Sequence, residues 1–148
     1  MLYREIYTAT WREECQPYPG IMAMLDRLHG CDVKLAVLSN KPHPFTEQFI
    51  EAFLGRSHFT VVYGERPGWP KKPDPTVART ILGELACPPE HSLFVGDSAV
   101  DILTGKGAGM AAFGVSWGFR DAAELLASGA LKVLDDPSEL VDYVSTPL

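Results

Sequence analysis

The chain has 148 residues, the usual size of one compact domain, and 46% of them are hydrophobic, which suffices for a sizeable core. Its formal net charge of −6 argues against broad binding to nucleic acid or membrane surfaces, which rests on basic patches. No apolar stretch is close to the length of a membrane span, which is about 18 consecutive residues. The cysteines are not spaced as metal ligands are. We therefore expect a single domain, residues 1–148, of a cytoplasmic protein that acts on a small molecule.

Helix and strand patterns alternate along the chain, as in layered α/β domains. After Pro19, apolar residues at helical spacing predict a helix that ends near Gly30. The later elements, in chain order, are expected at 33–38 (strand), 42–54 (helix), 59–63 (strand), 76–85 (helix), 93–95 (strand), 100–108 (helix), 111–115 (strand), 122–126 (helix), 132–134 (strand) and 138–144 (helix). This order predicts a layered α/β fold around a parallel sheet.

Three segments carry side chains suited to a phosphate and a metal ion. The strand at 33–38 is followed by Ser39 and Asn40, whose hydroxyl and amide groups can donate to phosphoryl oxygens. The segment PKKPDP, 70–75, contains prolines that restrict their neighbours and so fix the direction of Lys72, whose ammonium can neutralise phosphate charge.

The third segment, LFVGDSAVD, is the most informative. It places Asp97 at the tip of a buried strand and Asp101 one helical turn later, with Gly96 at the turn and Ser98 as a candidate helix cap. Ligands of open α/β sheets bind at such strand ends, so both carboxylates can face one Mg2+ ion directly or through water. Alone, an Asx turn beside a helix start explains this segment equally well.

Taken together and in order, these motifs resemble the haloacid dehalogenase superfamily of phosphohydrolases, most closely its phosphoglycolate phosphatase-like branch. LSNK is similar to the second motif of that family, KPDP to the third, and VGDSAVDI to the fourth. The resemblance implies a three-layer Rossmann-like core with a parallel sheet. It also implies Ser39, Asn40 and Lys72 as phosphate-binding residues, and Lys72, Asp97 and Asp101 as catalytic residues. It also implies Asp97 and Asp101 as ligands of a Mg2+ cofactor, and a small phosphorylated metabolite as substrate.

The first motif of that family, a DxDGT-like strand end with the aspartate nucleophile, does not occur in these residues. Residues 3–15 resemble the last helix of the family's cap, so 1–18 is interpreted as a cap remnant and the chain as the carboxyl-terminal part of a longer phosphatase. The missing strand is central in the family's sheet. Its loss predicts an open slot beside the strands at 33–38 and 93–95, to be filled by a partner chain, by a homodimer or by rearrangement.

Two functions therefore remain open. One is a phosphoric monoester hydrolase of which this chain is an incomplete portion with little activity alone. The other is a non-catalytic phosphate-binding or assembly module that uses the same pocket. His43, near Ser39, and Arg120, after a predicted strand, are weaker candidates for contact with an anionic ligand. The glycine-rich run 105–109 lies at a helix end, where a helix stop explains it better than a phosphate loop does.

Overall fold

A computed structural model describes residues 17–118 and 120–145, and the statements below concern those residues. The main elements in chain order are α2 (Ile21–Gly30), β1 (Ala36–Pro42), α3 (His43–Phe49), β2 (Val61–Glu65), α4 (Thr76–Leu85), β3 (Leu93–Gly96), α5 (Ala99–Gly107), β4 (Ala111–Val115), α6 (Ala122–Ala127), β5 (Lys132–Leu134) and α7 (Ser138–Ser145). A π-helical turn, Ile50–Leu54, continues α3, and short 3-10 turns, Arg56–His58 and Pro89–His91, precede β2 and β3.

The strands form two separate parallel sheets. β1 pairs with β2, from Ala36 opposite Val61 to Pro42 opposite Glu65. The second sheet has the order β3-β4-β5. The expected α/β fold with a parallel sheet is confirmed, and β1 and β3 do not pair with each other in this structure.

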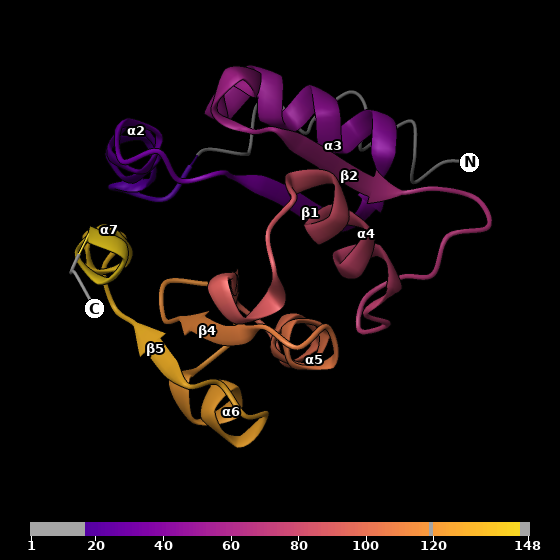
Figure 1. The fold of residues 1–148 in the computed structure, drawn as a ribbon. Helices are drawn as coiled ribbons and strands as arrows, with labels where there is room; N and C mark the ends of the chain where they lie inside the picture. The colour runs from indigo at the N-terminus through magenta and orange to yellow at the C-terminus, as the bar shows by residue number, and fades with distance from the viewer. Residues whose placement is uncertain (1–16, 119, 146–148) are drawn as a thin grey trace, which may run out of the picture.

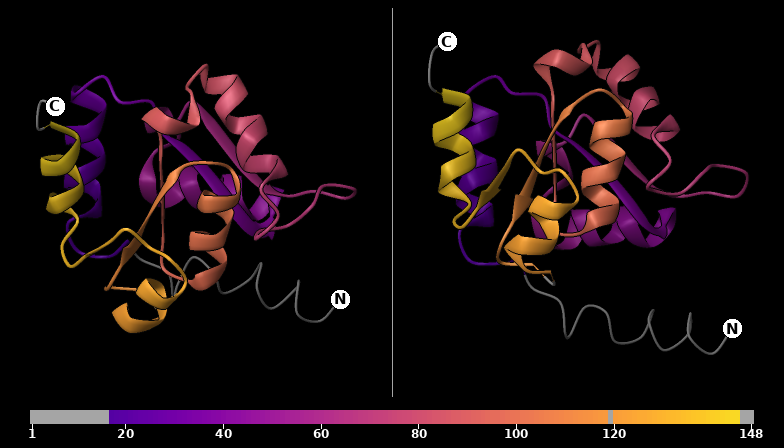
Figure 2. Two further views of the ribbon diagram at one scale, coloured as in Figure 1. Left: turned by 60° about the horizontal axis from the view of Figure 1, so that its bottom comes forward. Right: turned by 90° about the horizontal axis from the view of Figure 1, so that it is seen from below.

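Helices cover both faces of the sheets, as Figure 1 shows for α3 and α4 on opposite sides of β1 and β2. On one side, buried side chains of α2 and the α3 region pack on Val62, and α2 also lies beside α7 in both views of Figure 2. On the other side, α4 packs on Val61 while α5 and α6 pack on Ala112. The result is the predicted three-layer arrangement.

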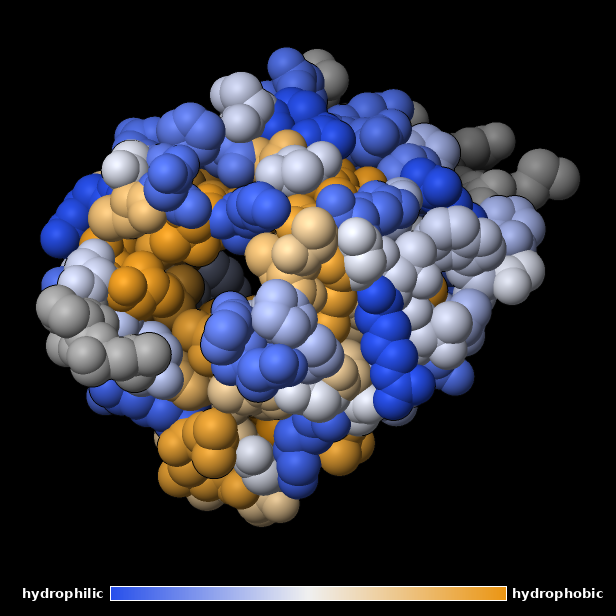
Figure 3. All heavy atoms as spheres, in the orientation of Figure 1, coloured by the Kyte–Doolittle hydropathy of each residue, from blue (hydrophilic) through white to orange (hydrophobic). Residues whose placement is uncertain are grey.

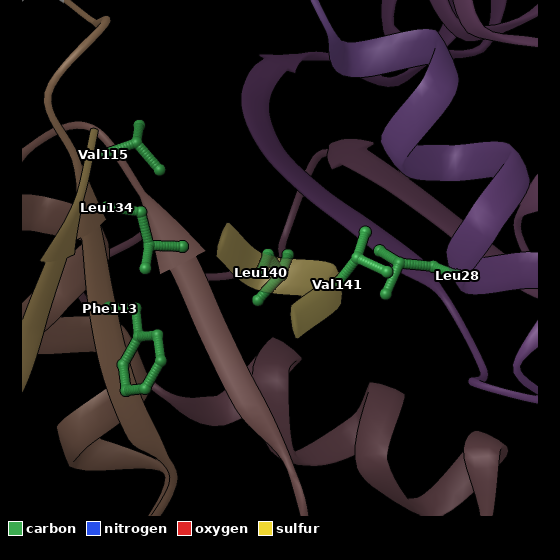
Figure 4. Close-up of a cluster of buried hydrophobic side chains, with 6 residues drawn as sticks. All are labelled: Leu28, Phe113, Val115, Leu134, Leu140 and Val141. Carbon is green, nitrogen blue, oxygen red and sulfur yellow. The ribbon is translucent and has the colours of Figure 1, made fainter. Parts of the chain in front are cut away.

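One apolar cluster crosses from the first half of the chain to the second. It joins α2 to β4, β5 and α7 (Figure 4), and its buried members are Leu28, Phe113, Val115, Leu134, Leu140 and Val141. On the opposite side, Ala78 and Leu82 of α4 meet Ala108 and Met110, with Leu38 of β1 and Phe94 of β3 packed against them. The two half-sheets are therefore joined by side chains from both helical layers.

The burial of the strands is inverted relative to a continuous sheet. Most residues of β2 and β4 are buried, whereas no residue of β1 or β3 is fully buried, and Val95 of β3 is 37% exposed. In a continuous parallel sheet, the inner strands are the best covered. Figure 3 shows a hollow with hydrophobic residues at its rim between the α2–β1 side and the α7–β4 side. β1 and β3 thus each have an edge without a strand neighbour among the described residues, which agrees with the slot that the family resemblance implies.

Several element boundaries differ from the sequence-based prediction. The first strand begins at Ala36 instead of residue 33 and continues through Ser39 and Asn40 to Pro42. The next strand begins at Val61 instead of residue 59. The Thr60 N–H donates to the Leu35 carbonyl, and the paired register starts one residue later, with Ala36 opposite Val61. The predictions for α4 and β5 match the observed bounds. No helix in the described residues is long and apolar enough to cross a membrane.

A histidine ties α2 to the turn before β2. The ring of His58 bonds the carboxylate of Asp26 through Nε2 at 2.8 Å and the carbonyl of Leu54 through Nδ1 at 2.7 Å. The hydrogen bond to Asp26 is the main reason that the pKa of His58 is raised above its ordinary value of 6.5. Both ring nitrogens face acceptors, so the doubly protonated imidazolium fits this position best.

We expect the free energy of unfolding to decrease as the pH rises through the elevated pKa of His58. The stabilisation is complete below the unfolded pKa of 6.5 and is lost once the folded ring releases its proton. Urea unfolding of the wild type and of His58→Gln between pH 5 and about pH 8.5 measures the free energy of unfolding at each pH. The substitution should make this free energy depend less on pH. His91→Gln, at an exposed position, is the control. An unchanged profile in His58→Gln would contradict this assignment.

Candidate functional site

The predicted site residues come from three segments that the fold brings to one place. Ser39 and Asn40 lie in the last part of β1, and Lys72 lies in the loop from β2 to α4. Asp97 directly follows β3, and Asp101 is in the first turn of α5. Hydrogen bonds connect these segments in series across the slot, as the following distances show.

Asn40 holds the backbone on which Lys72 is carried. Its Oδ1 accepts from the Lys72 N–H at 3.0 Å, and its Nδ2 donates to the Lys72 carbonyl at 3.2 Å. This pair of bonds fixes the loop to the end of β1, a role that the sequence analysis did not assign to Asn40. One N–H of the side-chain amide is used in this way, so Asn40 can meet a phosphate through its backbone N–H or through the second N–H of its amide.

Lys72 and Asp101 form a close ion pair. Lys72 Nζ donates to Asp101 Oδ1 at 2.6 Å, and the two side chains are only 13% and 10% exposed. Such a pair is desolvated, so the ammonium is held in position by the carboxylate and is not screened by water. The ion pair links the half of the molecule that contains β1 to the half that contains β3.

The second oxygen of Asp101 closes the amino end of its own helix. Oδ2 accepts hydrogen bonds from the backbone N–H groups of Asp97 and Ser98 at 3.0 and 3.3 Å, and from Ser98 Oγ at 3.1 Å. Ser98 is the residue before the helix, as predicted. Gly96 permits this arrangement, since a Cβ at position 96 would collide with the Asp101 side chain. Both oxygens of Asp101 are therefore engaged within the protein.

Asp97 differs from Asp101 in having a carboxylate without a hydrogen bond or ion pair to the described residues. It is partly buried at the tip of β3, and the backbone of Gly118 lies against it, so that a Cβ at position 118 would collide with the Asp97 side chain. Sequence reasoning did not single out Gly118, because the contact joins two loops that are distant in the chain. Asp97 is thus confined in position and has its oxygens available.

These residues fit part of a magnesium site. Mg2+ takes one or two carboxylates and keeps waters or phosphate oxygens on its other positions. Asp97 is the residue suited to direct coordination, with Asp101 behind it. The described part of the chain contains no group of three or more acidic, histidine or cysteine side chains placed to hold a metal. Asp97 would thus supply one of the one or two carboxylates that such a site uses.

The remaining candidates have different environments. Ser39 Oγ accepts from the Lys41 N–H at 3.1 Å, so its hydroxyl proton can be donated to a ligand. Arg120 lies 4.0 Å from Glu124 on the surface and 59% of its side chain is exposed. His43 faces Gly64 and Arg66 of the neighbouring strand end.

The ion pair predicts a measurable coupling. Asp101→Asn keeps an acceptor for the helix start but leaves the Lys72 ammonium nearly buried and unpaired, so we expect it to lower the free energy of unfolding by about 3 kcal/mol. A double-mutant cycle with Lys72→Met, followed by urea unfolding, should give a coupling energy of about 1–3 kcal/mol. Additive effects would show that the pair does not contribute to joining the two halves.

Comparisons with known proteins agree with this geometry. The model of the haloacid dehalogenase-like hydrolase family matches residues 1–115. Phosphoglycolate phosphatase of Vibrio parahaemolyticus is 30% identical over 144 residues, which are 97% of this chain and 63% of the relative. That of Pseudomonas fluorescens is 31% identical over 140 residues, covering 95% of this chain and 51% of the relative.

Solved structures give the same result. The CbbY protein of Rhodobacter sphaeroides, solved in complex with phosphate, is 31% identical, with a TM-score of 0.79 over 92% of this chain and 61% of that one. A haloacid dehalogenase-like hydrolase of Streptococcus pneumoniae shares the fold, with a TM-score of 0.87 over 97% of this chain and 67% of that one at 24% identity.

The chain spans about three fifths of the length of several of the relatives that it matches. The match to the family model nevertheless covers well over half of the chain, and the parallel α/β fold agrees with it. The motif segments that carry Ser39, Lys72 and Asp97 lie within the matched residues. The chain therefore belongs to the haloacid dehalogenase-like hydrolase family.

Proposed function

We propose that this chain is the phosphate-binding part of a Mg2+-dependent phosphomonoesterase that acts on small phosphorylated acids such as 2-phosphoglycolate. The observation that carries this proposal is the connected series Asn40–Lys72–Asp101 beside the unengaged carboxylate of Asp97. It places a fixed ammonium and an available carboxylate at the edge of the fold where β1 carries Ser39 next to Asn40. The similarity to phosphoglycolate phosphatases supports the choice of substrate class.

Each residue has a distinct part in this mechanism. The Ser39 hydroxyl and the Asn40 backbone N–H donate to the non-bridging oxygens of the phosphoryl group and hold it in line for attack. Lys72, oriented by Asp101, adds a positive charge where negative charge develops in the transition state. Asp97 would hold the metal ion, and Gly118, which lies against it, would keep that carboxylate in place. The metal, when bound, neutralises charge on the transferring phosphoryl group.

In this proposal, the nucleophile comes from outside the described residues. We propose that it is carried on an extended segment that enters the slot between β1 and β3 and runs parallel to both. Such a strand would satisfy the unpaired edges and cover the exposed Val95. A carboxylate at its carboxyl end would lie between Ser39 and Asp97, where it could attack phosphorus and supply the second metal ligand. Without it, the chain alone should turn over little or no substrate.

A non-catalytic phosphate-binding module remains the second candidate. The observation that favours it is that no DxD sequence is present in this chain while the phosphate-binding side chains are. Both candidates share the pocket, so they differ only in whether a bound phosphoester is cleaved once the slot is filled.

Phosphate release distinguishes them. The chain is assayed with 2-phosphoglycolate and an aryl phosphate, in Mg2+ or chelator, with and without a separately produced amino-terminal part of the Vibrio parahaemolyticus enzyme. We expect release only in the mixture with Mg2+, and a loss of at least 100-fold in Asp97→Asn, on the order expected when a metal ligand in the transition state is removed. Binding without release in every mixture would favour the non-catalytic module. Mg2+-dependent release by the chain alone would place a nucleophile within it.

Amide exchange tests the slot itself. Alternate residues of a strand direct their N–H groups to opposite neighbours, so every second amide of β1 and β3 should exchange quickly while those facing β2 and β4 are protected. Residue-resolved exchange should show the fast set slowing when the amino-terminal part is added. Uniform protection in the chain alone, together with a dimer in sedimentation, would mean instead that a second copy occupies the slot.

A further inference from the structure

Arg66, which directly follows β2, packs against two aromatic rings and has no role in the mechanism proposed above. The guanidinium of Arg66 lies 4.7 Å from the ring centre of Tyr63 and 5.0 Å from that of Trp69. The two rings meet edge to face at 5.3 Å, and the Tyr63 hydroxyl is held by Glu84. Stacking on aromatic faces leaves the in-plane N–H donors of an arginine available to a ligand while restricting the side chain to one position.

The charge of this arginine is not neutralised within the described residues. The ion pairs there do not include Arg66, and the adjacent Glu65 pairs with Lys71 at 3.2 Å. The Nε atom of Arg66 is buried and has no hydrogen-bond partner in the structure. A buried donor without an acceptor costs about 1–3 kcal/mol, and more for a charged group, so this position favours an anion.

The neighbouring histidine strengthens this conclusion. His43 Nδ1 accepts from the Gly64 N–H at 3.1 Å, and a backbone amide can only donate. In the neutral ring, the proton is therefore on Nε2, the atom that lies 2.8 Å from Nη2 of Arg66. Two N–H donors face each other there, and the nearest acceptor for His43 is Glu47 at a long 3.4 Å, with a side chain that is 52% exposed. An anionic oxygen beside the two nitrogens, accepting from both N–H groups from one side, would satisfy both.

The pair lies at the same edge as the phosphate-binding residues. Arg66 follows Glu65, which is opposite Pro42 in the β1–β2 register, and His43 comes directly after Pro42. The same loop that starts at Arg66 leads to Lys72, which Asn40 holds. Ser39 lies three residues before Pro42, so an anion at Arg66 would lie about 10 Å farther along this edge than Ser39, counted along the strands.

We infer that Arg66 and His43 form a binding site for a second anionic group, a carboxylate or a second phosphate, of the phosphorylated substrate. The inference rests on the proposed function, since it takes the phosphoryl group to be bound at Ser39 and Lys72. It gives the β2–α4 loop a role in selecting substrates that carry two anionic groups over simple phosphate esters.

Calorimetric titration of the 148-residue chain tests this site with three ligands: 2-phosphoglycolate, 1,3-propanediol bisphosphate and ethyl phosphate. The wild type should bind at least one of the first two about tenfold more tightly than ethyl phosphate, the value for one good charge-assisted contact. Arg66→Gln should remove this preference and leave the affinity for ethyl phosphate within about twofold. Arg56→Gln, at the opposite end of β2, makes the same change in net charge and should retain the preference. Circular dichroism confirms that each variant is folded.

The outcomes separate this inference from the proposed function. Equal affinity of the wild type for all three ligands, or a preference that survives Arg66→Gln, would overturn the second anion site and leave the phosphate site in place. A wild-type chain that binds none of the ligands would reject the phosphate site and this inference with it. Ser39→Ala provides the reference for the phosphate site, because it should lower the affinity for all three ligands by a similar factor. Should Arg66→Gln fail to fold, Arg66→Lys keeps the charge but not the flat donor set, and it should retain only part of the preference.

Discussion

The constraint that shapes this molecule is that its two parallel sheets share no backbone hydrogen bond within the described residues, so contacts of side chains hold the halves together. Three of these contacts lie in different parts of the fold. The apolar cluster that includes α2 and α7 joins the halves in one helical layer, and the packing of Leu82 against Met110 joins them in the other. The Lys72–Asp101 ion pair joins them at the edge that carries the candidate site. The geometry of the site therefore depends on the same interaction that joins the halves, and the site cannot loosen without weakening the fold.

The sequence predicts the order of helices and strands well, because each helix has a continuous apolar face and each strand an apolar run. It predicts α4 and β5 to the residue. It places β1 three residues too early and ends it before Ser39, because an apolar run reports burial while the ends of a strand are set by pairing with its neighbour. The slot was predicted only from the resemblance to a family, and the inverted burial of the strands agrees with it.

At the site, the sequence identifies the residues that come together but not how they divide the work. Spacing places Asp97 and Asp101 one turn apart and treats them alike. The structure distinguishes them. One oxygen of Asp101 accepts from Lys72 and the other from N–H groups at the start of its helix, whereas the carboxylate of Asp97 is available to a ligand. Three contacts join segments that are distant in the chain, so no local sequence pattern predicts them. They are those of Asn40 with Lys72, of Gly118 with Asp97 and of Arg66 with His43.

The open edges of β1 and β3 also bear on the behaviour of this chain in concentrated solution. An unpaired strand edge is a template on which any extended apolar segment can add, and folded proteins protect their outer edges with charges, prolines or short strands. Here β3 is short and β1 ends in Lys41 and Pro42, so both edges carry some of these protections, while Val95 of β3 is 37% exposed. If these edges take up the strand proposed above, chain synthesised without that strand would present two unpaired edges and would be more prone to aggregate.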